Sequence, residues 1–155
     1  MDEEFDYNDA EELRFSVERY EEMIRNKDQY FFDAQAFEGI IDYFIEKNDP
    51  IKALQVVEYA INQHPYASVF LIRQAQLYVV TNRAHEALNI LDRAETLESS
   101  NPDIFIIRGS IYEKFEMFDE AISQYNLAID FAEDVDDIHL HIAYAFENLG
   151  QYDKA

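Results

Sequence analysis

Apolar residues recur along this chain at intervals of three and four, the spacing that places them on one face of an α-helix. Polar turn signals interrupt the pattern twice in every 34 residues, as at Asn48-Asp49-Pro50 and His64-Pro65. Asp49 before Pro50 is typical of a helix N-terminus. The aspartate side chain there accepts hydrogen bonds from unpaired backbone N–H groups, and proline is tolerated because its missing N–H would have no partner in the helix. No stretch alternates as a half-buried strand does. The pattern predicts helices over residues 35–47, 50–63, 68–81, 84–98, 103–115, 118–132 and 137–148.

A constant period of 34 residues organises these helices into pairs. The alanines that mark it are Ala53, Ala87, Ala121 and Ala155. Other positions keep the same phase: the alanines Ala60, Ala94 and Ala128, the small residues Ala75, Gly109 and Ala143, and the aromatics Phe44, Tyr78, Tyr112 and Phe146. A fixed period of this length indicates one helix-turn-helix unit copied and stacked. We expect the small residues to face the alanines where paired helices cross, because a close crossing excludes long side chains.

The first 33 residues lie outside this register, since Arg19 and Asn26 stand where the two alanines belong. Their apolar residues nevertheless form a helical stripe, made of Leu13, Val17, Tyr20 and Ile24. Asp9 with Glu12 three residues later is typical of a capping box at a helix start. The pattern predicts a capping helix over residues 9–27 that occupies the place of a second helix.

The last repeat is only half present, because Ala155 begins the second helix of its pair. We therefore expect either that the parent protein continues or that this is a fragment. The predicted organisation is an acidic N-terminal segment with its capping helix, three full repeats and a partial fourth, with bounds at 1–33, 34–67, 68–101, 102–135 and 136–155.

These residues resemble the tetratricopeptide repeat family over positions 34–155. The third repeat carries the resemblance best, with Phe105, Gly109, Tyr112, Ala121, Tyr125 and Ala128 in place. Four residues depart from the family pattern. Ile41 replaces a small residue, which suggests a looser helix crossing; Gln74 and Arg108 replace leucine; His139 replaces an aromatic. The resemblance implies an all-α, right-handed superhelical solenoid of antiparallel helix pairs, with an N-terminal capping helix.

The resemblance also implies a concave groove, lined by the first helix of each pair, that receives a peptide. Its matching residues here are Glu38, Asp42, Val69, Ile72, Gln76, Val79, Ile106, Ser110, Glu113, Leu140, Tyr144 and Glu147. The apolar members gather in the second to fourth units, and the acids lie at both ends. An alternative is that some of the apolar residues face the next helix or a missing C-terminal repeat.

The chain has 33 acidic and 12 basic residues, a net charge of -21. Such a chain repels phosphate backbones and anionic lipid headgroups, so neither nucleic acid nor a membrane is the expected partner. A neutral or basic polypeptide is electrostatically favoured, although the acids can also serve solubility alone. The sequence contains no cysteine and no apolar run of about 18 residues. A cytoplasmic protein without a membrane span is expected.

The sequence carries no catalytic or metal-binding motif. Its three glycines, Gly39, Gly109 and Gly150, do not build a phosphate-binding loop. His139 and His141 lie two residues apart on a predicted helix and so point to different faces. The acidic segment from Asp134 to Asp137 is not followed by the glycine and the closing glutamate that a calcium-binding loop requires. We therefore expect no enzyme activity, no cofactor and no metal.

The sequence predicts a noncatalytic interaction module that binds an apolar, basic-flanked polypeptide segment in its concave groove. Among the residues that match the family's carboxylate clamp for chaperone tails, which are Glu38, Asp42, Arg73, Asp103 and Ile107, only Arg73 is basic. Capture of an acidic chaperone tail is therefore not expected. The alternative from another class is a structural element that forms homo-oligomers through the groove or an exposed C-terminal face.

Overall fold

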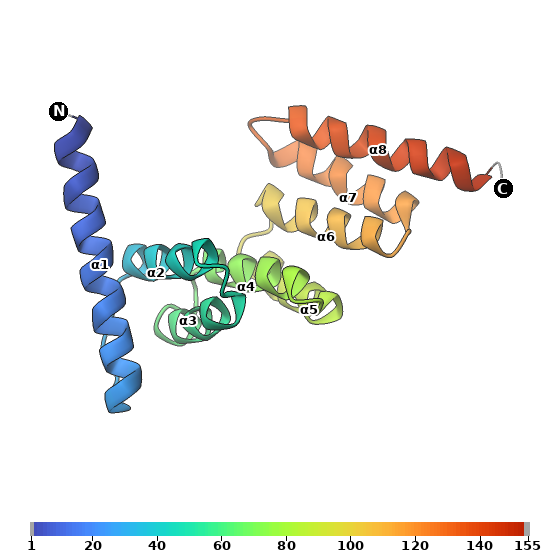
Figure 1. Cartoon of the computed structure of the whole chain (residues 1–155). Helices are drawn as coiled ribbons and strands as arrows, with labels where there is room; N and C mark the ends of the chain where they lie inside the picture. Colours follow the sequence, from blue (N-terminus) through green and yellow to red (C-terminus); the bar gives the residue numbers. More distant parts are fainter. Residues whose placement is uncertain (1, 154–155) are drawn as a thin grey trace. The chain divides into compact units, whose positions relative to one another are not determined.

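The computed structural model describes the backbone of residues 2–153 and the side chains of residues 8–150. Within these residues the chain is all helical (Figure 1). The helices are α1 (Asp2–Asn26), α2 (Ala34–Glu46), α3 (Pro50–Gln63), α4 (Ser68–Val80), α5 (Ala84–Leu97), α6 (Pro102–Lys114), α7 (Phe118–Phe131) and α8 (Asp136–Asp153). They form two compact units, Met1–Ala67 and Ser68–Ala155, which are described separately below.

Helices α2 to α7 begin and end within two residues of the bounds predicted from the sequence. The predictions at the two ends of the chain were less accurate. Helix α1 begins at Asp2, so Asp9 lies inside the helix and the predicted capping box is wrong. Helix α8 continues to Asp153, so the predicted end of this helix at residue 148 is also wrong.

The turns between paired helices repeat with the same period as the helices. Asn48, Asn82 and Glu116, each 34 residues from the next, have φ values of 57°, 65° and 61°. Asparagine enters this left-handed region more readily than most residues and is a common residue after a helix end. Gly150 has the same phase, but no glycine of the described residues has a positive φ. The repeated backbone geometry confirms the predicted turns after α2, α4 and α6.

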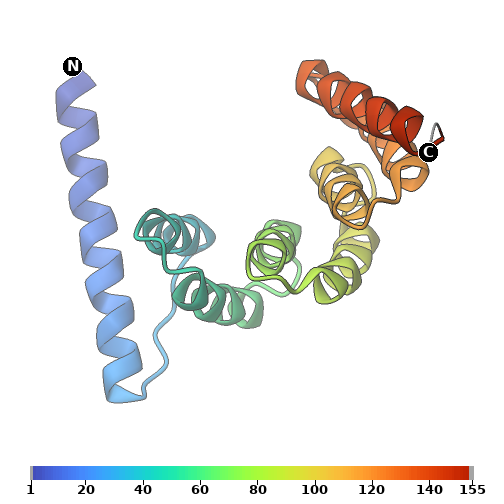
Figure 2. The same cartoon turned by 45° about the vertical axis from the view of Figure 1, so that its right-hand side comes forward.

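In the N-terminal unit, α1 packs on α2 through a small aromatic cluster. Val17, Tyr20 and Met23 of α1 are buried. The ring of Tyr20 meets three other rings edge-on, those of Phe32, Phe44 and Tyr59, at centroid distances of 6.4, 6.3 and 5.9 Å. Ile24, predicted to belong to the buried stripe, is 43% exposed, and Met23 takes its place. Because α1 meets α2 along only part of its length, its N-terminal turns project past α2 (Figures 1 and 2).

The segment that connects α1 to α2 is held by side chains from both α1 and the end of α3. Gln63 donates a hydrogen bond to the carbonyl of Tyr30 at 2.7 Å and accepts one from the N–H of Phe32 at 3.0 Å. Arg19 donates to the carbonyl of Phe31 at 3.1 Å, and its guanidinium lies 4.9 Å from the ring centre of Phe32. The connection is thus fixed by backbone-directed hydrogen bonds, although no regular element covers it.

The C-terminal unit follows the predicted repeat packing closely. Helix α4 packs on α5, α6 packs on α7, and α8 packs on α7. The predicted small residues Ala75 and Gly109 are buried, and a Cβ added at Gly109 would lie 2.4 Å from Cε1 of Tyr125. The alanines of the second helices have no exposed surface; they are Ala87, Ala94, Ala121 and Ala128. The alanines that recur every 34 residues therefore lie where paired helices cross closely.

In the first repeat, Ile41 is fully buried at the position where the other repeats carry a small residue. Helices α2 and α3 approach each other along fewer residues than α4–α5 or α6–α7 do. This difference agrees with the looser crossing expected from the larger side chain.

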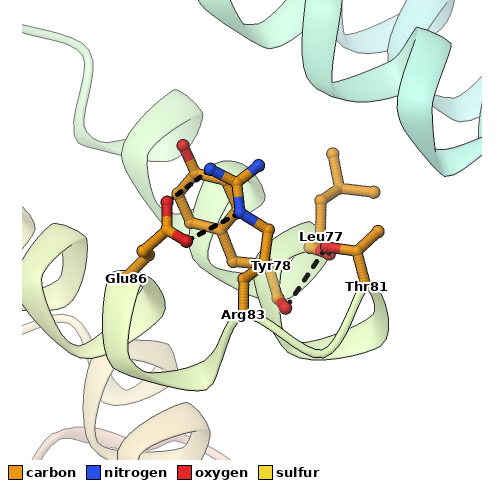
Figure 3. Close-up of polar contacts among 5 residues, drawn as sticks. All are labelled: Leu77, Tyr78, Thr81, Arg83 and Glu86. Atoms are coloured by element: carbon orange, nitrogen blue, oxygen red, sulfur yellow. Dashed lines mark hydrogen bonds and ion pairs between the residues drawn. The ribbon is translucent and has the colours of Figure 1, made fainter.

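The turn between α4 and α5 is closed by an arginine (Figure 3). The guanidinium of Arg83 lies 4.2 Å from the ring centre of Tyr78 and binds both carboxylate oxygens of Glu86. The hydroxyl of Thr81 donates to the carbonyl of Leu77 at 2.8 Å. The hydrogen bond from Arg83 lowers the pKa of Glu86. These local bonds stabilise a helix start that has no side-chain cap, since Arg83 is the N-cap residue of α5.

The two polar residues that replace leucine in the repeat pattern are both buried. Arg108 on α6 is 8% exposed, and its guanidinium pairs with Asp92 at 2.7 Å and Glu95 at 2.6 Å on α5. Gln74 on α4 is 7% exposed, and its side-chain carbonyl oxygen has no hydrogen-bond partner among the described residues. An arginine is therefore accommodated at this position because a neighbouring helix supplies two carboxylates.

Candidate functional site

A groove of about 490 Å³ runs between α1 and α2 in the N-terminal unit. One wall comes from α1 and includes Glu12 and Phe15, and the other comes from α2 and includes Glu38 and Asp42. Its complete lining is Asp9, Glu12, Leu13, Phe15, Ser16, Asp33, Gln35, Ala36, Glu38, Gly39 and Asp42. Glu38 and Asp42 were predicted as groove residues from the sequence. The structure places both of them together with a set of α1 residues.

The lining of this groove contains five carboxylates and no lysine, arginine or histidine. Asp33 has a structural role, since its carboxylate accepts a hydrogen bond from the N–H of Ala36 at 2.7 Å and caps α2. Glu38 is half-buried and Asp42 is exposed. The groove therefore presents a concentrated negative potential on a surface that is accessible to a partner.

The remaining ten predicted site residues lie in the C-terminal unit, on the first helices α4, α6 and α8. On α4, Gln76 is exposed and Val69 and Val79 are half-buried, but Ile72 is only 5% exposed. Ile72 is part of the core in this structure and offers little surface to a partner. The α4 contribution to a binding surface would thus come from the other three residues.

On α6, the predicted residues Ile106, Ser110 and Glu113 are all half-buried. Ile106 packs against the core cluster around Phe105, and the hydroxyl of Ser110 donates to the carbonyl of Ile107 at 2.8 Å. Burial, together with the nearby carboxylate of Glu113, raises the pKa of the Tyr125 hydroxyl above its usual range. These α6 residues combine structural packing with a limited exposed surface.

Helix α8 carries the most exposed of the predicted residues, with Leu140 at 69% and Tyr144 at 57% exposed and Glu147 also at the surface. Ala143 is exposed and Phe146 is 56% exposed, and Ala155, the alanine predicted to face Ala143, lies outside the described residues. The reason is that the described residues contain no helix paired with α8. Its opposite side, with Ile138 and Ala145, is buried on α7.

The contribution of α1 to the groove was not predicted from the sequence. Asp9, Glu12, Leu13, Phe15 and Ser16 all line it. One signal was present, because Phe15 lies off the apolar stripe that docks α1 and is 66% exposed. An aromatic residue on the polar side of an amphipathic helix is a sign of a second contact surface.

Among residues 8–150, no three histidine, aspartate or glutamate side chains are placed so that they could share a metal ion. No helix within the described residues combines the length and the apolar composition that crossing a bilayer requires.

Comparison with known proteins matches one repeat of the chain to a family model. Residues 102–135 match the family model of the tetratricopeptide repeat. This is the repeat in which Gly109 meets Tyr125 and the predicted pattern is most complete. No curated protein matches the sequence.

Several solved structures share the fold at low sequence identity. The first TPR of Spaghetti (RPAP3), bound to the HSP90 peptide SRMEEVD, is 15% identical, with a TM-score of 0.70 over 77% of this chain and 99% of that one. The Sgt2 TPR domain from Aspergillus fumigatus is 11% identical, with a TM-score of 0.71 over 78% and 82% of the two chains. MamA is 15% identical, with a TM-score of 0.72 over 88% and 78%. The matched model shows a tetratricopeptide repeat at residues 102–135, and the solved structures show that the chain shares the fold of TPR domains.

Proposed function

We propose that the chain is a noncatalytic interaction module that binds a polypeptide segment through the first helices of its repeats. The observation that carries this proposal is the pair Leu140 and Tyr144, which stand one helical turn apart on α8 and are 69% and 57% exposed. Neighbouring exposed apolar side chains on a charged protein are typical of a recognition surface. The related first TPR of Spaghetti, which binds a peptide, supports the same class of function.

The expected partner has apolar anchors flanked by lysine or arginine. Apolar anchors supply most of the affinity of such interfaces, while charges at the rim set the association rate and the choice of partner. Glu113 and Glu147 are the acids beside the apolar residues of α6 and α8. The peptide SRMEEVD in the structure of similar fold carries three acids, and we expect such a tail to bind poorly, because this chain has a net charge of -21.

A peptide-display experiment tests this proposal directly. Peptides selected on the wild-type chain should be rich in apolar residues and in lysine or arginine, and calorimetry should show them binding more than about tenfold more weakly to Leu140→Asp. The matched control is Leu127→Asp on the second helix α7, because Leu127 is also exposed, at 42%. Equal loss of affinity in the two variants would contradict a binding surface on the first helices.

A second function, self-assembly, rests on a separate observation. His139, Ala143 and Phe146 are exposed on α8, whereas the corresponding residues of α6, which are Phe105, Gly109 and Tyr112, are buried or half-buried in the unit. A second copy of the chain could cover this face. Light scattering after gel filtration should then show a dimer for the wild type and a monomer for Phe146→Asp. A monomeric wild type at high concentration excludes this alternative.

A further inference from the structure

One side of α8 is apolar and exposed, and no helix of the described residues covers it. The other side is buried, since Ile138 and Ala145 pack into the core clusters that α8 shares with α7 (Figure 1). On the open side Leu140 is 69% and Phe146 is 56% exposed, and Ala143 between them is also exposed. Large apolar side chains that remain exposed together on a charged protein are typical of a contact surface.

The earlier first helices use the corresponding side to pack against another helix. The α4 residues two repeat periods before His139, Ala143 and Phe146 are all buried, and they are Leu71, Ala75 and Tyr78. A small residue at the middle position lets the paired helix approach to about 8–10 Å between axes. Ala143 therefore leaves room for a second helix to approach α8 closely.

The open side of α8 is also poor in charge. From His139 to Gly150 the sequence contains one acid, Glu147, although 33 of the 155 residues of the chain are acidic. Charged residues are depleted in the centre of protein–protein interfaces. This side of α8 can therefore meet a second copy of itself without bringing many acids together, even though the chain has a net charge of -21.

The open side is complementary to its own sequence read in the opposite direction. His139 and Glu147 lie four residues before and after Ala143, so in an antiparallel pair of α8 helices centred on Ala143 each histidine is level with the glutamate of the other copy. Leu140 and Phe146, three residues to either side, are level in the same way. The imidazole N–H can donate to the carboxylate, and the two apolar side chains can pack together. A parallel pair would instead bring the two Glu147 side chains level, and like charges repel.

We infer that α8 pairs with α8 of a second copy of the chain, antiparallel and with Ala143 on the twofold axis. The inference rests on the self-assembly proposed above and specifies its surface and its register. Both copies use the same patch, so the pairing closes as a dimer and leaves no open end for further copies. Leu140 belongs to this pair and to the proposed peptide surface, so a bound peptide and the dimer exclude each other at that residue.

Disulfide trapping tests the position of the twofold axis. The chain has no cysteine, so Ala143→Cys gives each copy a single thiol. On the axis, the two Cβ atoms at this position come within the about 3.5–4.5 Å that a disulfide needs. In oxidised glutathione, Ala143→Cys should form covalent dimers about tenfold faster than Ser123→Cys, the matched control at an exposed position of α7. Electrophoresis without reductant measures both rates, and equal rates would overturn the inference.

An exchange of charges tests the register. His139→Glu makes an acid level with Glu147 of the other copy and should raise the dissociation constant of the dimer about tenfold, measured by sedimentation equilibrium. The double variant His139→Glu/Glu147→His exchanges the two residues of the pair, so the constant should return to within about threefold of the wild type.

The control for net charge is His139→Glu/Glu120→His, since Glu120 is exposed on α7 and lies outside the pair. It has the same net charge as the exchanged variant but should dimerise as weakly as His139→Glu alone. Recovery in both double variants would assign the effect to net charge, and recovery in neither would exclude the register, so either result overturns the inference. Circular dichroism should show that all these variants remain folded, because the substituted residues are exposed.

The outcomes separate this inference from the self-assembly on which it rests. If the wild type stays monomeric at high concentration, self-assembly fails and the α8 pair fails with it. If the wild type is a dimer but Ala143→Cys crosslinks no faster than Ser123→Cys, the α8 pair fails and self-assembly stands with another arrangement of the copies. A wild-type dimer, preferential crosslinking at position 143 and recovery in the exchanged variant alone support the inference.

Discussion

The two units hold equivalent helices in different ways. In the C-terminal unit, α5 and α7 pack through alanines with no exposed surface, and Gly109 lets α7 approach α6. In the N-terminal unit, α1 packs on α2 and carries Arg19 and Asn26 where the repeat period would place alanines. It is held by the rings around Tyr20 and by hydrogen bonds to the connecting segment. A helix can therefore pack on a repeat without the repeat's small residues when aromatic and polar contacts hold it.

The largest expected effect concerns the close crossing itself. Gly109→Ala places a Cβ 2.4 Å from the fully buried Tyr125 ring, and overpacking of this kind costs about 1–3 kcal/mol or more. The higher helix propensity of alanine offsets about 1 kcal/mol of that cost. We expect a net loss of about 2 kcal/mol in the free energy of unfolding, measured by urea denaturation followed by circular dichroism.

The other two glycines provide matched controls. Gly150→Ala on α8 meets nothing within 4 Å and should stabilise the chain by about 0.5–1 kcal/mol. Gly39→Ala meets the side-chain tip of Leu13 at 3.2 Å, where contact and helix propensity nearly cancel, so the change should stay within about 0.5 kcal/mol of zero. If all three variants gain stability alike, the crossing at Gly109 is not as close as the structure has it.

An intermediate effect is expected at the N-terminal cap. Arg19→Ala installs the residue that the repeats carry at this phase, yet it should destabilise the unit, because it removes the stacking on Tyr30 and Phe32 and the hydrogen bond to Phe31. We expect a loss of about 1 kcal/mol and faster hydrogen exchange in the second half of α1. Arg14→Ala is the control, since its ion pair with Glu18 is exposed and should contribute less than about 0.5 kcal/mol. Equal effects at the two arginines would mean that the stacking does not hold α1.

The helices and turns that repeat could be predicted from the sequence, because each signal occurs several times. Asn48 and Asn82 mark the same left-handed turn, and the alanines mark the same crossing. The ends of the chain could not be predicted as well. The acidic start of α1 lacks an apolar stripe that would reveal a helix. The last helix was predicted to end at residue 148, although the glycine at position 150 is able to remain helical.

The candidate site also contains residues on a repeat helix and residues outside the repeats. Glu38 and Asp42 were predicted from the family pattern to line a concave groove of the first helices, which stays a prediction, and the structure places both beside α1. Glu12 and Phe15 lie on α1. The orientation of α1 depends on Tyr20, on Met23 and on the hydrogen-bonded connecting segment, and none of these follows the 34-residue period. The burial of Ile72 was also missed, since spacing alone does not separate a groove residue from a core residue.

The smallest expected effect is common to both units. Each has a buried tyrosine whose hydroxyl lacks a hydrogen-bond partner among the described residues, Tyr20 in the first and Tyr125 in the second. Because nothing is lost with the hydroxyl, Tyr20→Phe and Tyr125→Phe should change the free energy of unfolding by less than about 1 kcal/mol at pH 7, towards greater stability. Urea denaturation at pH 7 measures this, and a clear loss would reveal a hydrogen bond that the structure lacks.

The same variants should differ from the wild type in how their free energy of unfolding changes at alkaline pH. Burial raises the pKa of both tyrosines, so above pH 10 the unfolded chain releases these protons while the folded chain retains them. The wild type then loses stability as the pH rises, because the folded state binds more protons than the unfolded state. Each phenylalanine variant lacks one of these protons and should lose less stability than the wild type between pH 9 and pH 11. Parallel curves for wild type and variants would show that the two hydroxyls reach solvent in the folded state.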